Sequence, residues 1–227
     1  MTKRVWSIAA LLVLFPASPG TAQQIEFTPL AGIFVPTADL GEFSVSDTAF
    51  GTGTVTVKQK TAGVLGARLG AWWSKNLAWE AGYFSYAFSD LETTAAGISG
   101  VGDACADVPD FSCSARVWYL SSKLLYRFLP AGDSPWGILV GGGAAVIGHQ
   151  GDFWGGGDAI TDLGGVIDIG VTYNLSRRFA IRADAEDFLY SFKGRVTIGE
   201  DDQIEADSRF QNDLLFTAGL VIRIGRE

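Results

Sequence analysis

Histidine, cysteine and clustered basic residues are nearly absent from this 227-residue sequence. His149 is the only imidazole, so it is the only candidate for the histidine that hydrolytic sites generally place beside a nucleophile or a water. The two cysteines, Cys105 and Cys113, have no further metal ligands near them in the sequence, and we predict neither a metal site nor a cofactor. An acidic chain without a lysine or arginine cluster argues against nucleic acid as a partner.

Long apolar runs are also missing, except at the N-terminus. Lys3 and Arg4 precede the apolar run 5–15, and the small residues around Ala22 provide a cleavage point. We interpret residues 1–22 as a cleaved secretory signal peptide. The run is shorter than the roughly 18 residues of a spanning helix, which disfavours an N-terminal membrane anchor.

The predicted mature chain, residues 23–227, keeps 15 basic against 25 acidic residues, a net charge near −10. Its length suits a single all-β domain. Because an exported chain meets an oxidising compartment, we expect Cys105 and Cys113 to form a disulfide.

Alternation of apolar and polar residues dominates the mature chain and predicts β-strands. Much of the abundant glycine lies inside the alternating segments, which suits the curvature of a small closed barrel. Eight segments alternate or are apolar on both faces: 25–35, 61–73, 77–88, 115–128, 136–148, 162–173, 178–190 and 212–224.

The connections between these segments alternate in length. Four are long (37–60, 89–114, 149–161 and 191–211) and three are short (74–76, 130–135 and 174–177). Up-and-down transmembrane barrels have long loops outside the cell and tight turns on the periplasmic side. The pattern therefore predicts an all-β fold, an eight-stranded antiparallel up-and-down transmembrane β-barrel with four external loops.

Aromatic residues flank each short turn, which is typical of the interfacial girdle of a membrane barrel and has no reason to occur in a soluble sandwich. The predicted girdle residues are Trp73, Trp79, Phe128, Trp136, Tyr173 and Phe179.

Alternate residues of a strand point to opposite faces. The charged residues in the middle of the strands have one parity and share one face, and the apolar residues occupy the other. In a barrel these charges point into a lumen that their own side chains fill, so each base should lie against an acid. Asp187 alone has the outward parity, near the loop end of its strand. The predicted inward charges are Arg68, Lys123, Arg127, Arg182 and Arg223 against Glu80, Asp162, Asp168, Asp184, Glu186 and Asp213, with Lys123, Arg182, Asp168 and Asp184 at the centre.

Three stretches carry a family resemblance: "TAGLVIRI" (217–224), "FTPLAGIFVPTADL" (27–40) and "LAWEAGYFSYAF" (77–88). The mature chain resembles the small OmpA/OmpX-type eight-stranded outer-membrane barrels, including opacity-like surface proteins. The resemblance implies a location in the outer membrane of a Gram-negative-type bacterium, contact with its lipids and lipopolysaccharide, and help from periplasmic chaperones during biogenesis. It also implies a terminal strand read by the barrel assembly machinery, through Thr217, Gly219, Ile222 and Ile224.

Function is less determined than fold. The leading hypothesis is a monomeric, non-catalytic barrel with a structural or surface-interaction role through its four external loops, whose ligand is unknown. The alternative is a small passive channel for hydrophobic or minor polar solutes. A third hypothesis is a barrel enzyme in which His149 works with Asp152 or Asp158. The competing interpretation is that His149 is a solvated loop histidine without a catalytic role. Acidic loop residues lack the spacing of a dedicated Ca²⁺ loop and are interpreted as solvated.

Overall fold

The computed structural model describes residues 24–47, 51–97, 105, 113–129, 134–151, 160–192, 195–198, 202–205 and 209–225. The predicted signal peptide, Asp152 and Asp158 lie outside these residues. Within the described part of the chain, no helix is both long and apolar enough to cross a membrane.

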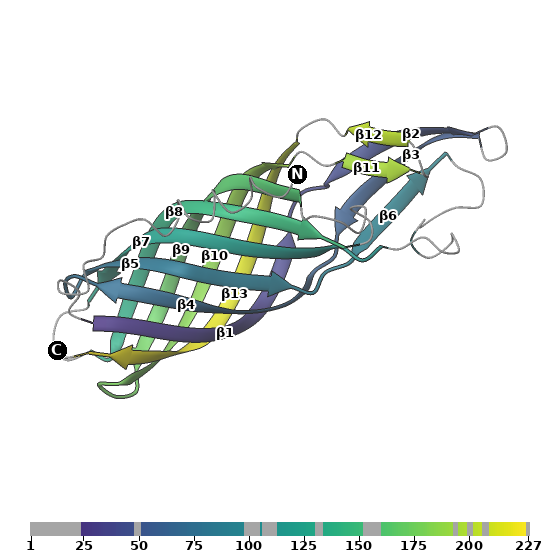
Figure 1. Ribbon diagram of the computed structural model, residues 1–227. Helices are drawn as coiled ribbons and strands as arrows, with labels where there is room; N and C mark the ends of the chain where they lie inside the picture. The colour runs from purple at the N-terminus through teal and green to yellow at the C-terminus, as the bar shows by residue number, and fades with distance from the viewer. Residues whose placement is uncertain are drawn as a thin grey trace.

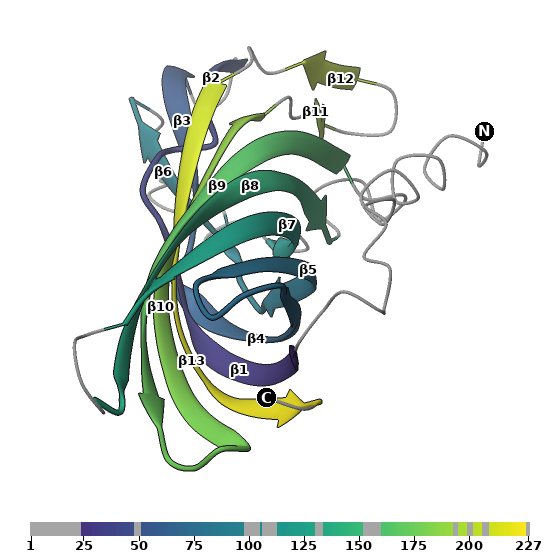
Figure 2. The same cartoon turned by 90° about the vertical axis from the view of Figure 1, so that its left-hand side faces the viewer.

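Eight strands close into an antiparallel barrel, in which each strand pairs with its neighbours along the barrel sequence and the last pairs with the first. The predicted eight-stranded up-and-down architecture is therefore confirmed (Figures 1 and 2). The barrel strands are β1 (Gln24–Pro36), β4 (Ala62–Trp72), β5 (Leu77–Ala87), β7 (Arg116–Phe128), β8 (Trp136–Gln150), β9 (Ile160–Asn174), β10 (Phe179–Phe192) and β13 (Arg209–Ile224).

The three short connections lie at one end of the barrel, where β13 also ends (Figure 1). Each contains a serine whose hydroxyl accepts backbone N–H groups, a common way to close a turn. Ser74 Oγ accepts from Leu77 N at 3.0 Å, Ser134 Oγ from Trp136 N at 3.3 Å, and Ser176 Oγ from Phe179 N at 3.1 Å.

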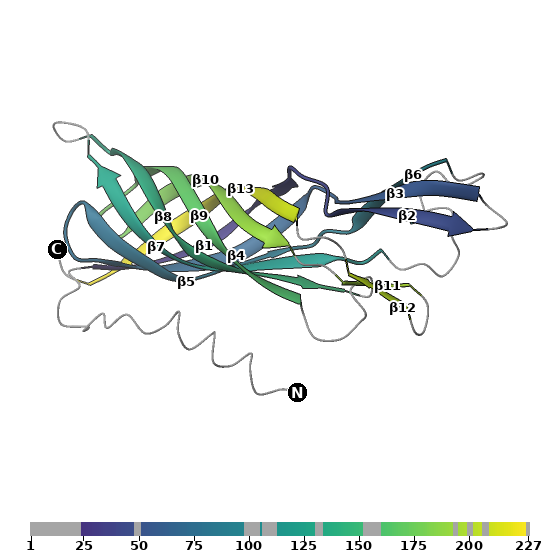
Figure 3. The ribbon, with the colours of Figure 1, turned by 90° about the horizontal axis from the view of Figure 1, so that it is seen from above.

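The long connections contain strands of their own, which the sequence reading treated as loop. The first forms the hairpin β2 (Gly41–Asp47) and β3 (Gly51–Gln59), and the second contributes β6 (Leu91–Ala96). These three form one sheet with β3 in the middle, which continues beyond the barrel (Figures 1 and 3). In the last connection, β11 (Arg195–Ile198) pairs with β12 (Asp202–Glu205). Threonine and valine in β3 favour an extended chain, and pairing satisfies its backbone groups.

The outer wall of the barrel is aliphatic. Leu163, Ile167 and Ile169 on β9 are 68%, 58% and 57% exposed, and most residues of the same parity on the other strands are apolar. A tight contact occurs on β8, where a Cβ added to Gly148 would lie 2.0 Å from Cε2 of the Trp118 indole, so only glycine fits beneath that ring.

The interior divides into a charged part and an apolar part. Toward the end that carries the β2–β3–β6 sheet, called here the projecting sheet, side chains from the barrel and from this sheet form one buried apolar cluster, in which Phe34 and Phe188 of the barrel join Val57 and Leu91 of the sheet. The sheet is therefore docked on the top of the barrel core. Charged side chains fill the middle and the other end.

Candidate functional site

Seven charged side chains from five barrel strands occupy the middle of the lumen. Three are cationic and four anionic, and all are buried. The predicted central four residues are among them. The cluster, called here the central charge layer, consists of Arg68, Glu80, Lys123, Asp168, Arg182, Asp184 and Glu186.

Every cation of the central charge layer contacts three carboxylates. Arg182 lies 2.6 Å from Glu80, 2.7 Å from Asp184 and 3.2 Å from Asp168. Lys123 lies 3.0 Å from Glu80 and 2.7 Å from Asp168, and it also pairs with Glu186.

Arg68 completes the layer and ties it to the terminal strand. Its guanidinium pairs with Asp184, lies 2.7 Å from Glu186 and 3.7 Å from Glu80, and donates to Thr217 Oγ1 at 2.9 Å. Buried charges are stable only when opposite charges and hydrogen bonds surround them. This arrangement therefore fixes the positions of the five strands relative to one another along the barrel axis.

A second group lies toward the tight turns. Glu26 accepts from Arg223 Nε at 3.0 Å and pairs with Arg127 at 3.2 Å, and the Arg127 guanidinium lies 3.6 Å from the centroid of the Trp72 ring. Such stacking is a favourable cation–π contact. Sequence reasoning predicted both arginines but missed Glu26, although the alternation of Ile25, Glu26 and Phe27 places this carboxylate on the inward face.

A third group lies toward the projecting sheet. Asp213 accepts from Tyr119 at 2.9 Å and from Tyr190 at 2.8 Å. The Tyr190 hydroxyl lies 3.3 Å from His149 Nε2, and His149 Nδ1 lies 4.0 Å from Asp162. Asp162 and Asp213 thus face inward as predicted but stand apart from the central charge layer.

The interpretation of His149 as a solvated loop histidine is wrong. Strand β8 continues through Gln150, two residues beyond the predicted segment, and the imidazole is 0% exposed. Its ring packs 4.7 Å from that of Phe192. The two aspartates considered as its partners lie outside the described residues.

No metal-binding group emerges from the described residues, in which no cluster of three or more histidine, cysteine or acidic side chains has a suitable geometry.

Comparison with known proteins decides the family. The family model described as "Outer membrane protein beta-barrel domain" matches residues 7–218, most of the chain. The chain belongs to this family. The protein is accordingly an outer-membrane barrel of a Gram-negative-type bacterium. No curated protein matches the sequence.

Solved structures agree on the fold. The outer membrane protein OprG from Pseudomonas aeruginosa is 9% identical with a TM-score of 0.59, and the match covers 90% of this chain and 97% of that one. The outer membrane protein AlkL, solved in lipid bilayers, is 15% identical with a TM-score of 0.55, covering 93% of this chain and 95% of that one.

The predicted girdle residues of this outer-membrane barrel all lie near the tight turns. Phe128, Trp136, Tyr173 and Phe179 are exposed, with the rings of Trp136 and Tyr173 4.7 Å apart. The other two, Trp73 and Trp79, are half-buried, and Trp79 Nε1 donates to Ser122 Oγ at 2.9 Å. An interfacial role for all six remains a prediction.

The four residues of the predicted assembly signal lie on β13, next to β1. Thr217 faces the lumen, Ile224 is exposed on the outer wall, and Ile222 is half-buried. Gly219 allows the two strands to approach, because an added Cβ would lie 2.6 Å from the Pro29 carbonyl oxygen. Recognition by the assembly machinery stays a prediction.

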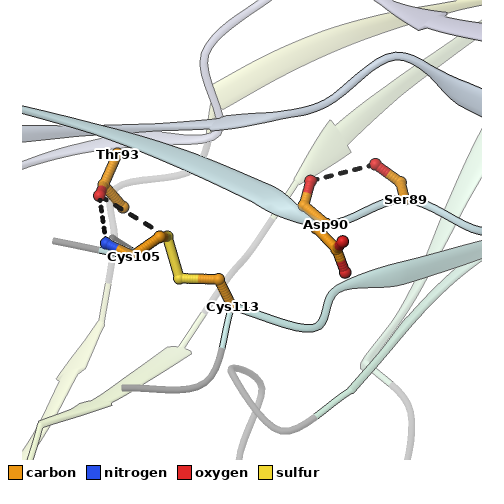
Figure 4. The surroundings of a disulfide bond; sticks show 5 residues. All are labelled: Ser89, Asp90, Thr93, Cys105 and Cys113. Atoms are coloured by element: carbon orange, nitrogen blue, oxygen red, sulfur yellow. Dashed lines mark hydrogen bonds between the residues drawn. A yellow bond between two sulfur atoms is a disulfide. The ribbon is translucent and has the colours of Figure 1, made fainter. Parts of the chain in front are cut away.

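The expected disulfide is present between Cys105 and Cys113 (Figure 4). It holds the later part of the second long connection against β6, because Cys105 N donates to Thr93 Oγ1 at 3.1 Å and Leu91 N donates to the Cys113 carbonyl at 2.9 Å. The disulfide therefore sits beside β6, an edge strand of the projecting sheet.

Proposed function

We propose that this protein is a non-catalytic outer-membrane barrel whose projecting β2–β3–β6 sheet serves as an interaction surface outside the cell. The observation that carries the proposal is the construction of that sheet. It joins two external connections into one hydrogen-bonded unit, bound at its edge by a disulfide and at its base by the barrel core.

The base of the sheet is fixed by hydrogen bonds between its own segments and to the residue that precedes β7. Leu40 N donates to the Val57 carbonyl at 2.8 Å, and Lys60 N donates to that of Asp90 at 2.8 Å. Gln59 Nε2 donates to the Ala115 carbonyl at 2.8 Å. An interaction surface held in this way loses less conformational entropy on binding than a flexible loop does.

A passive channel is the second candidate, and the apolar side chains that fill the barrel near the projecting sheet favour a hydrophobic solute for it. Solutes crossing the whole lumen would have to separate the buried ion pairs of the central charge layer, and this separation costs free energy. We therefore expect negligible conductance in planar bilayers. A steady, selective conductance of the wild type would favour the channel over the surface role.

The proposal assigns no catalytic role to His149. Its neighbours include the rings of Tyr190 and Phe192 and the carboxylate of Asp162, which form a packed, buried group. If the enzyme hypothesis held, His149→Ala would abolish an activity that the wild type shows in outer-membrane preparations.

The test compares cells carrying equal amounts of folded protein at their surface. In one variant a short Gly-Ser turn replaces residues 41–59; in the matched control the same turn replaces residues 195–205 of the β11–β12 hairpin. We expect the first replacement to abolish adhesion of cells to immobilised polysaccharides and proteins and to one another, and the control to retain it. Equal adhesion of wild type and the first variant would contradict the proposal.

A further inference from the structure

A polar cavity of about 540 Å³ lies where the projecting sheet meets the barrel. This volume is within the range of roughly 300–1,000 Å³ that small-molecule sites occupy. Its lining comes from the end of β1, from the end of β3 with the residues that follow it, and from β6. The cavity, called here the junction cavity, is lined by Val35, Pro36, Lys58, Gln59, Lys60, Thr61 and Glu92.

Hydrogen bonds fix the backbone beneath the junction cavity. Lys60 N donates to the Asp90 carbonyl at 2.8 Å, and the Lys60 carbonyl accepts from Ser89 Oγ at 2.6 Å. Gln59 Nε2 donates to the Ala115 carbonyl at 2.8 Å. Because the backbone is already held, binding of a ligand restricts only the lining side chains, and less conformational entropy is lost than in a flexible loop.

Three charged side chains of the junction cavity are exposed and carry no ionic partner. The strand register places Lys58 opposite Glu92, and Lys60 lines the cavity two residues further along. In the part of the chain that the structure describes, no ion pair joins any of the three to another residue. By contrast, Glu42 on β2 of the same sheet lies 3.8 Å from Arg209. The junction cavity therefore presents two ammonium groups and one carboxylate that are available to a ligand.

This set of groups specifies the charges of a ligand. Two ammonium groups attract two anionic groups, and the carboxylate of Glu92 attracts a cationic donor. Residues two apart on a strand are about 6.5–7 Å apart, so the two anionic groups must be joined by a short linker. Val35 and Pro36 offer apolar surface to the carbon atoms of such a linker. An acidic α-amino acid has all of these features: two carboxylates, one ammonium group and one or two methylene groups.

We propose that the junction cavity binds an acidic α-amino acid. Its two carboxylates accept from Lys58 and Lys60, its ammonium group donates to Glu92, and its methylene groups contact Val35 and Pro36. Glu92 provides the selectivity, because it attracts the ammonium group and repels a dicarboxylate of the same length that lacks one. This binding does not depend on the surface role of the projecting sheet, since a small ligand at the base of the sheet leaves the outer part uncovered.

The experiment measures binding of L-glutamate to the folded full-length protein in detergent by saturation-transfer NMR titration. Glutarate, which lacks the ammonium group, and L-glutamine, which lacks one carboxylate, are titrated for comparison. We expect the wild type to bind glutamate about tenfold more tightly than either analogue, because each analogue loses one charge-assisted hydrogen bond. The proposal is overturned if the wild type does not bind glutamate, or if it binds glutarate or glutamine as tightly.

Two variants assign the binding to the junction cavity. Lys58→Gln/Lys60→Gln should weaken glutamate binding about tenfold or more. Glu92→Gln should weaken glutamate binding but strengthen glutarate binding, a reversal that general loss of structure does not produce. Lys75→Gln, at an exposed tight turn, is the matched control and should bind as the wild type does.

Altered electrophoretic mobility after heating verifies that each variant is folded. Glutamate binding by the double lysine variant that equals that of the wild type would overturn the proposal. An unchanged preference for glutamate over glutarate in Glu92→Gln, or equal impairment of Lys75→Gln, would also overturn it.

Discussion

Replacing Arg182 by alanine should destabilise the barrel more than any exposed charge substitution. The guanidinium is 2% exposed and contacts three carboxylates, at 2.6, 2.7 and 3.2 Å. Its removal changes the central charge layer from three cations and four anions to two cations and four anions. The stranded carboxylates then repel one another in a space without room for full hydration.

The magnitude follows from burial. Removing one partner of a buried ion pair destabilises by about 3–5 kcal/mol, whereas an exposed pair contributes about 0–1 kcal/mol. Arg182→Ala should therefore lower the free energy of unfolding by about 3–5 kcal/mol. Asp184→Asn should have a smaller effect, because it leaves three cations facing three anions. The pair Arg182→Ala/Asp184→Asn should be less destabilised than the sum of its single changes, by about 1–3 kcal/mol.

Urea unfolding of the refolded protein in lipid vesicles, followed by tryptophan fluorescence, measures these differences. Arg177→Ala, at an exposed tight turn, is the control and should remain within about 0.5 kcal/mol of the wild type. A loss for Arg182→Ala no larger than for Arg177→Ala, or strict additivity in the cycle, would refute the assignment of the central charge layer as a coupled network.

Three further predictions concern other parts of the molecule. Serine at both Cys105 and Cys113 should leave barrel assembly intact but make the second external connection sensitive to protease, since closing a loop is worth at most about 2–4 kcal/mol; two free thiols in the exported protein would contradict this. In that cysteine-free background, a membrane-impermeant maleimide should label Asp47→Cys on intact cells and Ser176→Cys only after the outer membrane is broken, and the reverse pattern would invert the topology. Gly148→Val should lower stability by about 1–3 kcal/mol in urea unfolding, because the added side chain would overlap the Trp118 indole; wild-type stability would show that the ring moves aside without cost.

Local pattern was sufficient for the barrel strands and for the direction of most side chains. A strand has a two-residue period, so the alternation around Lys123 or Arg182 specifies which residues face inward without reference to any other strand. The tight turns could be predicted because they are local too: each turn serine accepts a hydrogen bond from a backbone N–H two or three residues away. The same reasoning could have predicted that Glu26 faces inward, because it alternates with the apolar residues Ile25 and Phe27.

Only the tertiary structure decided which residues of different strands lie at the same level along the barrel axis. Parity specifies a face, but the partners of a residue depend on strand register, which non-local pairing sets. Strand β3 pairs with β6 across an intervening barrel hairpin, so threonine-rich segments that looked like loop became a sheet. The pairing of the barrel strands brought His149 to Tyr190, which donates to Asp213, and it aligned Ala31, Ala218 and Ala183. These sites join residues that are far apart in the sequence, and only the packing of the closed sheet fixes their separation.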